Sequence, residues 1–151
     1  MRRLIVRVAE QTAEVWEGVI LLKTFAVSTA AQGIGCEEGS FCTPSGRLRI
    51  RRKIGADLPT GAVFKSRIFT GEIWPSSTCA AKEDLVLSRI LWLAGDEPHN
   101  ANTFERFIYL HGTNQEHLIG TPASHGCIRF RNADIIDVFE MLNEGDLVEV
   151  V

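Results

Sequence analysis

A cysteine and two histidines near the end of the chain are the residues whose types and spacing could do chemistry. Cys127 lies in the run Ser124-His125-Gly126-Cys127-Ile128-Arg129, and the pair His111-Gly112 lies upstream of it. The thiolate is the nucleophilic form of cysteine, and a free cysteine is mostly protonated near neutral pH. Cys127 therefore needs a base, and a cysteine with a histidine base is the arrangement that acyl-transfer enzymes use.

Both histidines are candidates for that base. His125 is two residues from Cys127, so in an extended chain the two side chains could face the same side. His111 follows the short apolar run 107–110, which predicts a buried strand that ends at this residue. A base must be held at hydrogen-bond distance, and a strand end is rigid. We therefore predict that His111 is the general base and that His125 has a supporting role.

The glycines beside these residues suit two further roles. A glycine lets the backbone approach a ligand closely, and a tetrahedral intermediate needs N–H donors aimed at its oxyanion. We predict that the N–H groups of Gly126 and Cys127 form this oxyanion hole. By the same logic, the carbonyl of Gly112 is predicted to accept a hydrogen bond from His111 and fix its tautomer.

Most of the elements that must position these residues are predicted to be strands. Asn132 is predicted to cap a helix over residues 133–142, where apolar residues recur at helical spacing, and Gly145 suits its end. A glycine- and serine-rich loop is expected over residues 28–46, and shorter loops over 74–77 and 95–103. The chain thus predicts one mostly β (α+β) domain over residues 1–151, with a C-terminal helix after the cysteine. Strands are expected at residues 4–9, 14–16, 19–27, 47–54, 62–69, 85–93, 107–110 and 147–150.

The arrangement of these motifs resembles the L,D-transpeptidase catalytic domain, the YkuD-type cysteine enzymes of bacterial cell-wall metabolism. The signature of that family is a histidine, a spacer of this length, and then Ser/Thr-His-Gly-Cys followed by an apolar residue. His111 and the run 124–128 match it, and Thr43-Pro44-Ser45-Gly46 is similar to a second element of the family, T-P-x-G. The resemblance covers nearly the whole chain and implies a β-sandwich or barrel.

The resemblance also implies a substrate and a mechanism. Enzymes of this family attack the carbonyl at the L-centre of the third residue of a peptidoglycan stem tetrapeptide, usually diaminopimelate, and expel the terminal D-alanine. Cys127 would carry the thioester, and His111 would take the thiol proton and later activate the acceptor. Neither a metal nor an organic cofactor is implied. Carbapenem-type β-lactams are expected as covalent inhibitors.

Several residues are candidates for binding the substrate. Arg129, beside the nucleophile, and Arg89, in an otherwise apolar strand, could hold substrate carboxylates bidentately. Trp74 lies in a predicted loop and could line the cleft, whereas Tyr109 could reach the site or fill the core. Ser124, at the start of the motif, is the remaining candidate.

The acceptor decides between two activities. An amine of a second stem would give a cross-link outside the cytoplasmic membrane, whereas water would give a tripeptide. The residues after Met1 lack the long apolar run of a secretory signal, and no stretch of about 20 apolar residues could span a membrane. These features favour a cytoplasmic L,D-carboxypeptidase that trims soluble muropeptides. A trimmed exported precursor would favour a periplasmic L,D-transpeptidase that forms 3-3 cross-links.

Charge and composition exclude some other classes. The chain has 16 basic and 19 acidic residues, which gives no electrostatic argument for a nucleic-acid partner. The basic run at residues 47–53 alternates with Leu48 and Ile50 and is interpreted as the solvent-facing side of a strand. A zinc site that uses Cys127 and His125 is weakly supported, because the cysteines and histidines lack the usual ligand spacings.

Two other interpretations of the motif stay open. A non-catalytic wall-binding module on the same scaffold is disfavoured by the intact pair Cys127 and His111, and a sortase-like enzyme fits the adjacent His-Gly-Cys poorly. The cysteines at 36, 42 and 79 have no neighbouring base and are expected to be inert free thiols.

Overall fold

The computed structural model describes residues 1–75 and 83–151 and has one sheet with a single α-helix over this part of the chain. The loop that we predict at Ser76-Ser77 and the thiol of Cys79 lie outside the described residues. The helix is α1 (Asn132–Met141), and two short 3-10 turns are η1 (Pro98–Asn100) and η2 (Glu116–Leu118). The strands are β1 (Arg2–Arg7), β2 (Thr12–Glu17), β3 (Ile20–Ser28), β4 (Gly46–Ile54), β5 (Ala62–Lys65), β6 (Ile68–Ile73), β7 (Val86–Gly95), β8 (Tyr109–Gly112), β9 (Ile128–Phe130) and β10 (Leu147–Val150).

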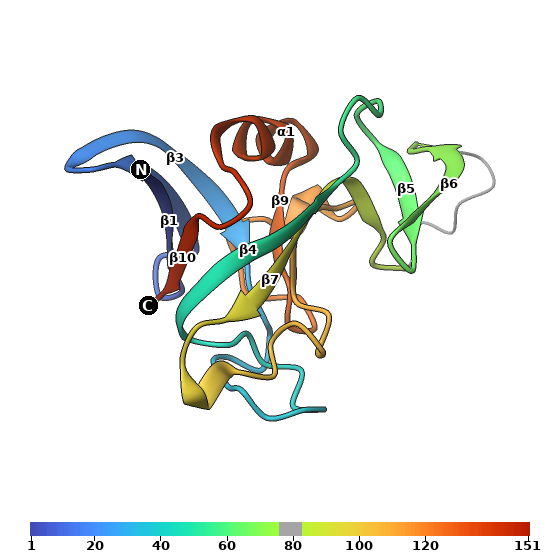
Figure 1. Cartoon of the computed structure of the whole chain (residues 1–151). Helices are drawn as coiled ribbons and strands as arrows, with labels where there is room; N and C mark the ends of the chain where they lie inside the picture. The colour runs from blue at the N-terminus through green and yellow to red at the C-terminus, as the bar shows by residue number, and fades with distance from the viewer. Residues whose placement is uncertain (76–82) are drawn as a thin grey trace.

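The sheet curls into a barrel because its first and last long strands pair with each other. The strand order is β4-β10-β1-β2-β3-β9-β8-β7-β5-β6, and β4 also pairs with β7. The first eight strands of this spatial order, from β4 through β10, β1, β2, β3, β9 and β8 to β7, thus form a closed ring. Strands β5 and β6 extend from the ring as a hairpin (Figure 1). This confirms the predicted mostly β fold with a barrel-like sheet and one C-terminal helix.

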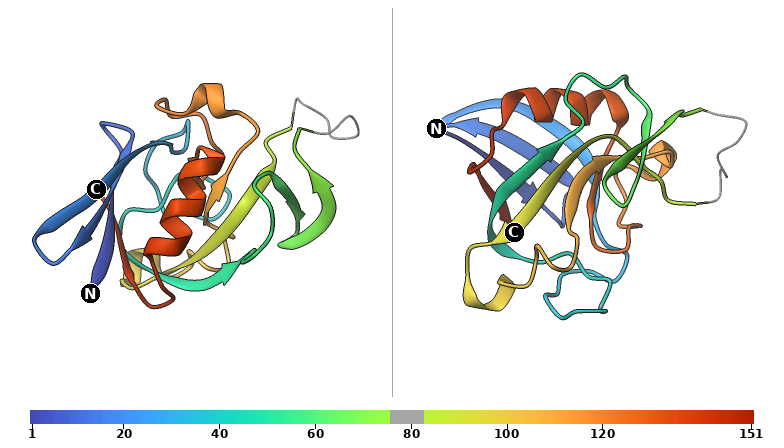
Figure 2. Two further views of the ribbon diagram at one scale, coloured as in Figure 1. Left: turned by 90° about the horizontal axis from the view of Figure 1, so that it is seen from above. Right: turned by 45° about the vertical axis from the view of Figure 1, so that its right-hand side comes forward.

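The two faces of the sheet have separate apolar clusters. The larger cluster fills the barrel under α1, which packs against β7 and β8 (Figure 2). The smaller cluster lies on the opposite face, between β7, β8 and the β5–β6 hairpin, and Cys127 packs against it. Because successive residues of a strand point to opposite faces, Leu110 and Ile128 enter the larger cluster while Tyr109 and Cys127 belong to the smaller one.

The strand predictions are largely confirmed, and two local predictions are wrong. Residues 62–69 form two strands, because Ser66 and Arg67 take positive φ values of 49° and 66° and turn the chain back on itself. The helix begins at Asn132 with Arg131 as its N-cap, and no side chain caps it. The Asn132 amide instead donates to the carbonyl of Thr113 at 2.8 Å, and its oxygen accepts from Ser88 at 2.7 Å. Tertiary partners thus replace the local cap.

Among the described residues, no helix combines the length and the apolar character that a membrane crossing requires.

Candidate active site

Cys127 lies just before β9, with its sulfur between two backbone groups of the preceding strand segment. The Tyr109 N–H donates to Sγ at 3.3 Å, and the thiol donates to the carbonyl of Phe107 at 3.4 Å. Phe107 has a φ of 59°, which a residue with a side chain rarely adopts, so this turn holds a strained backbone beside the thiol. The thiol is therefore fixed in position by backbone geometry.

His111 is held just as firmly in β8. It is 2% exposed, and its Nδ1 lies 2.5 Å from the carbonyl oxygen of Gly112. A carbonyl can only accept a hydrogen bond, so Nδ1 carries the proton and Nε2 of the neutral ring is the acceptor. This is the tautomer that a general base requires.

The parallel pairing of β8 and β9 brings Cys127 and His111 together. In the register of these strands, His111 lies opposite Arg129 and Leu110 lies opposite Ile128. Cys127 precedes Ile128, so His111 and Cys127 belong to neighbouring strands and share the face opposite the helix. Residues that are well separated in sequence thus lie on adjacent strand segments, because a parallel pair aligns the two segments.

Burial keeps both groups uncharged near neutral pH. It raises the pKa of the Cys127 thiol to about 11, against an ordinary value of 9.0, although the Tyr109 N–H acts in the opposite direction. Burial also lowers the pKa of His111 below its ordinary 6.5, and the carboxylate of Asp84 partly opposes this. The resting pair is therefore a thiol and a neutral imidazole, and the proton must move as the thiol attacks.

A network of side chains fixes the turn that carries Gly126. Ser124 Oγ donates to the carbonyl of Cys127 at 2.6 Å and accepts from the Gly126 N–H at 3.2 Å. Thr43 Oγ1 donates to the carbonyl of Gly126 at 2.9 Å. The Gly126 N–H is therefore engaged in this structure, whereas the Cys127 N–H has no partner among residues 1–75 and 83–151. Of the two N–H groups that we predict for the oxyanion hole, the one of Cys127 is available. Ser124, a predicted substrate contact, supports the turn.

Both glycines of the motif are required by their surroundings. Gly126 has a φ of 132°, and a Cβ there would lie 3.3 Å from the Cys42 carbonyl oxygen and from Ile108. A Cβ at Gly112 would collide with the side-chain oxygen of Asn132 and lie 2.8 Å from the carbonyl oxygen of Leu87. A larger residue at either position would displace the base or the turn of the nucleophile.

Arg129 is buried beside the site, and its two terminal nitrogens have partners, whereas its Nε has none among the described residues. Its side chain is 0% exposed, and it forms an ion pair with Asp84 at 3.0 Å. It also donates to Gln115 at 2.7 Å and to Ser28 at 3.0 Å. A buried cation needs such partners, and this position leaves no exposed guanidinium atom for the substrate carboxylate that we predict it to bind. Arg129 instead ties β9 to β3 and to the segment before β7.

Arg89 is placed away from the catalytic pair. The register of β7 shifts between Leu87 and Ile90, and Ser88 has a φ of 72°. Beyond this bulge the side chains alternate, and Arg89 lies on the helix side, as Leu91 and Leu93 do. Its guanidinium lies 5.4 Å from the ring centre of Phe139. Its Nη1 donates to the carbonyls of Leu58 and Ser88. The structure therefore does not bring Arg89 to Cys127, because Arg89 shares the helix-facing side of β7 with Leu91 and Leu93.

The other predicted site residues, two for binding and His125 for support of the catalytic pair, have different settings. Tyr109 is buried, and its hydroxyl accepts a hydrogen bond from Arg67 at 3.0 Å, so it lies at the site with its ring in the smaller cluster. His125 is exposed and packs edge-on against Phe41 at 6.0 Å, outside the first contacts of Cys127. Trp74 is half-buried at the base of the β5–β6 hairpin, where its N–H donates to Gly61.

Residues 1–75 and 83–151 contain no group of three or more His, Cys, Asp or Glu side chains placed to hold a metal ion. The described cysteines at 36, 42 and 127 are all free.

Two further residues, Asp84 and Thr43, position the site and were not predicted as site residues. Asp84 connects Arg129 to Thr113, whose hydroxyl lies 3.2 Å from its carboxylate. Thr43 holds the carbonyl of Gly126, and it belongs to the T-P-x-G element that we noted only as a resemblance. A signal for Thr43 was therefore present in the sequence, whereas a lone Asp in a loop gives none.

A model of the YkuD family, described as the L,D-transpeptidase catalytic domain, matches residues 1–150. The chain belongs to this family. A short segment is 44% identical over 46 residues to the probable L,D-transpeptidase YbiS of Escherichia coli strain K12, which covers 30% of this chain and 15% of that protein. The family membership rests on the match over nearly the full length of this L,D-transpeptidase domain.

Solved structures share the fold at low sequence identity. An L,D-transpeptidase from Mycobacterium smegmatis superposes with a TM-score of 0.64 at 16% identity over 99% of this chain and 58% of that chain. L,D-transpeptidase 3 from Mycobacterium tuberculosis, in complex with a faropenem-derived adduct, gives 0.62 at 14% identity over 99% and 59%. This L,D-transpeptidase domain thus spans less than two thirds of the length of these relatives.

Proposed function

We propose that this domain cleaves the bond between the L-centre of the third residue, a diaminopimelate, and the terminal D-alanine of a peptidoglycan stem tetrapeptide. In this proposal, water is the final acceptor and the enzyme is a cysteine L,D-carboxypeptidase. The observation that carries it is the Cys127 thiol, fixed by Tyr109 and Phe107 one strand away from a His111 of defined tautomer. Family membership supplies the substrate class.

The proposed reaction has two half-reactions on the same sulfur. His111 Nε2 takes the thiol proton as Sγ attacks the carbonyl carbon, and the Cys127 N–H stabilises the oxyanion. The intermediate collapses to a thioester, and D-alanine leaves with the proton that His111 returns to its amine. His111 then takes a proton from water, which attacks the thioester and releases the tripeptide, and the proton returns to the thiol.

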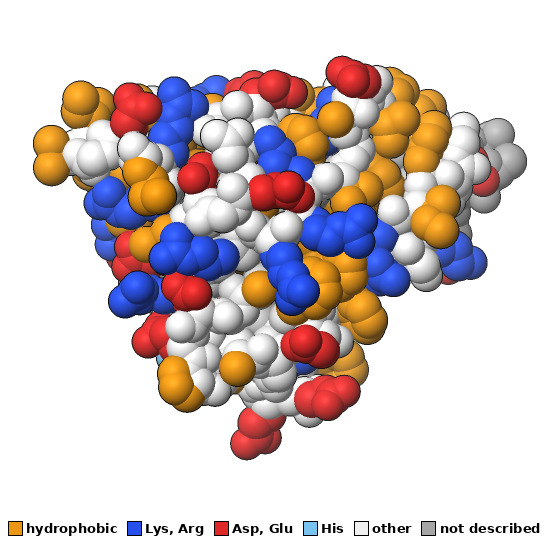
Figure 3. Space-filling model, viewed as in Figure 1, with side chains coloured by type: hydrophobic (Ala, Val, Ile, Leu, Met, Phe, Trp, Pro, Cys, Tyr) orange, Lys and Arg blue, Asp and Glu red, His pale blue; other side chains and the backbone are white. Residues whose placement is uncertain are grey.

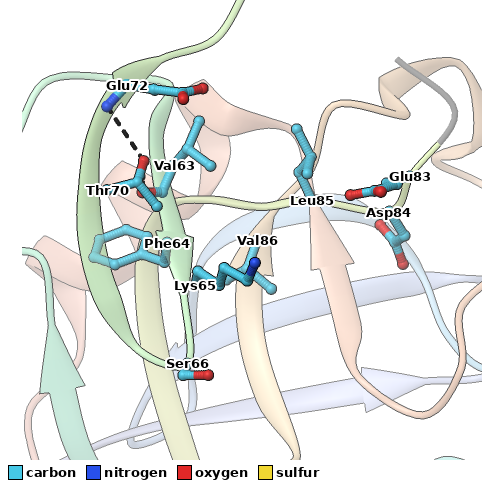
Figure 4. Close-up of a pocket in the computed structure, with 10 residues that line it drawn as sticks. All are labelled: Val63, Phe64, Lys65, Ser66, Thr70, Glu72, Glu83, Asp84, Leu85 and Val86. Carbon is cyan, nitrogen blue, oxygen red and sulfur yellow. Dashed lines mark hydrogen bonds between the residues drawn. The ribbon is translucent and has the colours of Figure 1, made fainter. Parts of the chain in front are cut away.

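Water as the acceptor needs no binding site beyond the residues already described. Transpeptidation needs a place for the amine of a second stem. One observation favours transpeptidation as the second candidate function. A cavity of about 500 Å³ lies between the β5–β6 hairpin and the segment before β7 (Figure 4). Glu72, Glu83, Asp84 and Lys65 line it, so its walls have more carboxylates than ammonium groups and would attract a protonated amine.

A β-lactam would use the same nucleophile. The relative from Mycobacterium tuberculosis was solved with a faropenem-derived adduct, which supports a proposal that carbapenem-type β-lactams acylate Cys127. The predicted cytoplasmic setting and the use of soluble muropeptides stay predictions. Fractionation of cells that make this protein from its natural gene would test the setting.

The experiment is incubation of the domain with a synthetic stem tetrapeptide that has diaminopimelate at position three and D-alanine at its end. We expect equimolar D-alanine and tripeptide, and neither product with Cys127→Ala. Joined stems with little free tripeptide would assign the second candidate function. If neither product forms while Cys127 remains reactive toward a carbapenem, the stem peptide is not the substrate.

A further inference from the structure

Three arginines on the open face of the sheet have aromatic rings as partners instead of carboxylates. The guanidinium of Arg51 lies 4.2 Å from the ring centre of Phe104, and that of Arg52 lies 5.9 Å from Trp92. Arg67 lies 4.9 Å from the rings of both Trp92 and Phe107. We refer to Arg51, Arg52, Arg67, Trp92, Phe104 and Phe107 as the arginine shelf.

These arginines also have no carboxylate within ion-pair distance, a property that they share with Arg47, Arg89, Arg106 and Arg131 among the described residues. None of the three forms an ion pair with any carboxylate in the described part of the chain. In a protein with a net charge of −3, three arginines gathered without a carboxylate are a local excess of positive charge. The arginines that do pair with carboxylates are Arg2, Arg3, Arg7, Arg49 and Arg129.

A bulge in β4 places two consecutive arginines on one face. Ile50 pairs with Leu93 and Arg52 pairs with Trp92, so Arg51 is an extra residue in the strand. In a regular strand Arg51 and Arg52 would point to opposite faces, but a bulge re-aims a side chain and leaves both above the aromatic stack. Figure 3 shows Lys and Arg side chains over the region of β4 and β7, next to hydrophobic side chains. Two arginines of the basic run at 47–53 therefore lie over aromatic rings, in addition to facing solvent.

Arg67 completes the shelf from another element. It lies in the turn between β5 and β6 with a φ of 66°, and its Nη1 donates to the Tyr109 hydroxyl at 3.0 Å. A positive φ in a residue with a side chain costs free energy and is most often kept at functional sites. Phe107, 51% exposed, has the same property on the facing segment.

The shelf begins at the nucleophile. Phe107 accepts the hydrogen bond from the Cys127 thiol through its carbonyl, and its ring lies 5.9 Å from that of Trp92. Trp92 stacks on Phe104 with ring centres 3.9 Å apart, and Arg51 lies over the outer ring. A continuous row of rings and guanidinium groups therefore runs from Cys127 to the edge of β4.

We propose that the arginine shelf binds a free carboxylate of the stem peptide. A guanidinium whose partner is a ring instead of a carboxylate keeps N–H groups available, and these match a carboxylate bidentately. Because the shelf begins beside Cys127, the candidate group is the carboxyl at the far end of the diaminopimelate side chain, which belongs to the residue whose carbonyl is attacked. The inference rests on the proposed function for its ligand and makes the shelf a determinant of specificity.

A binding measurement on a domain that cannot turn over the peptide tests whether the arginine shelf binds this carboxylate. The Cys127→Ala domain is titrated by calorimetry with the synthetic tetrapeptide, and with the same peptide in which the distal diaminopimelate carboxyl is an amide. Adding Arg51→Gln and Arg52→Gln should raise the Kd of the acid about tenfold, in proportion to a lost charge-assisted contact. The Kd of the amide should change less than about twofold. Arg67→Gln should act in the same direction.

Arg47→Gln is the matched control, because Arg47 is exposed on the same strand, carries the same charge and makes no contact with the shelf rings. It should leave both Kd values unchanged. Equal weakening of the binding of acid and amide peptides, or no weakening of the binding of the acid peptide, would contradict the proposal that the shelf binds this carboxylate. D-alanine release by the unmodified enzyme is measured separately, so loss of the proposed function and loss of the shelf give different results.

Discussion

The buried arginines and the shelf arginines of this domain differ in what surrounds the same side chain. Arg129 has no exposed side-chain surface, and its two terminal nitrogens contact Asp84, Gln115 and Ser28. Arg51 and Arg52 are exposed and lie on aromatic rings without a carboxylate partner among the described residues. The difference teaches that an arginine close to Cys127 in sequence need not have its donors available to a ligand, because burial makes a cation use its donors within the protein.

The two sides of the sheet also differ in whether their side chains fill the core or surround the candidate site. The helix side is filled with apolar residues and contains Arg89 as a structural contact with Phe139. The opposite side holds Cys127, Tyr109 and the shelf around a smaller cluster. Substitutions on the helix side should therefore change stability, and substitutions on the open side should change activity.

The largest effect is expected from the nucleophile itself. Cys127→Ala should reduce D-alanine release by at least about a thousandfold, because no other group can form the thioester. The midpoint of thermal unfolding should change little. Cys36→Ala is the matched control, a half-buried free cysteine in the loop before β4 that should retain activity. Residual turnover close to that of the unmodified enzyme would show that the sulfur does not carry the acyl group.

A smaller loss is expected from the base. His111→Gln should reduce kcat/KM about a hundredfold or more, since the thiol then loses its proton acceptor. His117→Gln, an exposed histidine of η2, is the control.

The pH profile tests the same residue. Burial lowers the pKa of His111 below 6.5, and the base works only when neutral. Activity should therefore persist as the pH falls to 6.5 and decline only below it, as measured from kcat/KM between pH 4 and 8. A decline that begins above pH 7 would contradict this assignment of the base.

On the buried side, Arg129→Met should act through folding. Removal of this cation leaves the partly buried Asp84 without its partner, and a broken pair of this kind costs about 3 kcal/mol of unfolding free energy. Urea unfolding measures the loss. The KM of the folded fraction should stay unchanged, and a rise in KM without a loss of stability would return Arg129 to the role of a substrate contact.

The smallest effect is expected at Arg89. Arg89→Met keeps the packing against Phe139 and removes hydrogen bonds to the carbonyls of Leu58 and Ser88, which should cost about 1 kcal/mol. Urea unfolding and steady-state kinetics measure the two consequences. Turnover of the tetrapeptide should be unaffected, and a specific rise in KM would place Arg89 in the substrate site after all.

Much of the scaffold could be read from local patterns. Alternating apolar residues and turn residues located β1, β2, β3 and β10, and the spacing of apolar residues located α1. Local patterns failed where tertiary partners decide, as at Asn132, whose side chain bonds Thr113 and Ser88 instead of capping the helix. They also failed at residues 62–69, where one expected strand is a hairpin.

By itself, the sequence pointed to the family and to Cys127 and His111 as the candidate reactive pair, because Ser124 to Cys127 with an upstream histidine matches the family's signature. The directions of the side chains around that pair were decided by the tertiary structure. The bulge in β4 turns Arg52 to the face of the aromatic rings, where Arg51 also lies, and a regular alternation would have turned it to the opposite face. A strand pattern has a period of two residues, so one inserted residue reverses the face, and only strand pairing shows where the insertion lies.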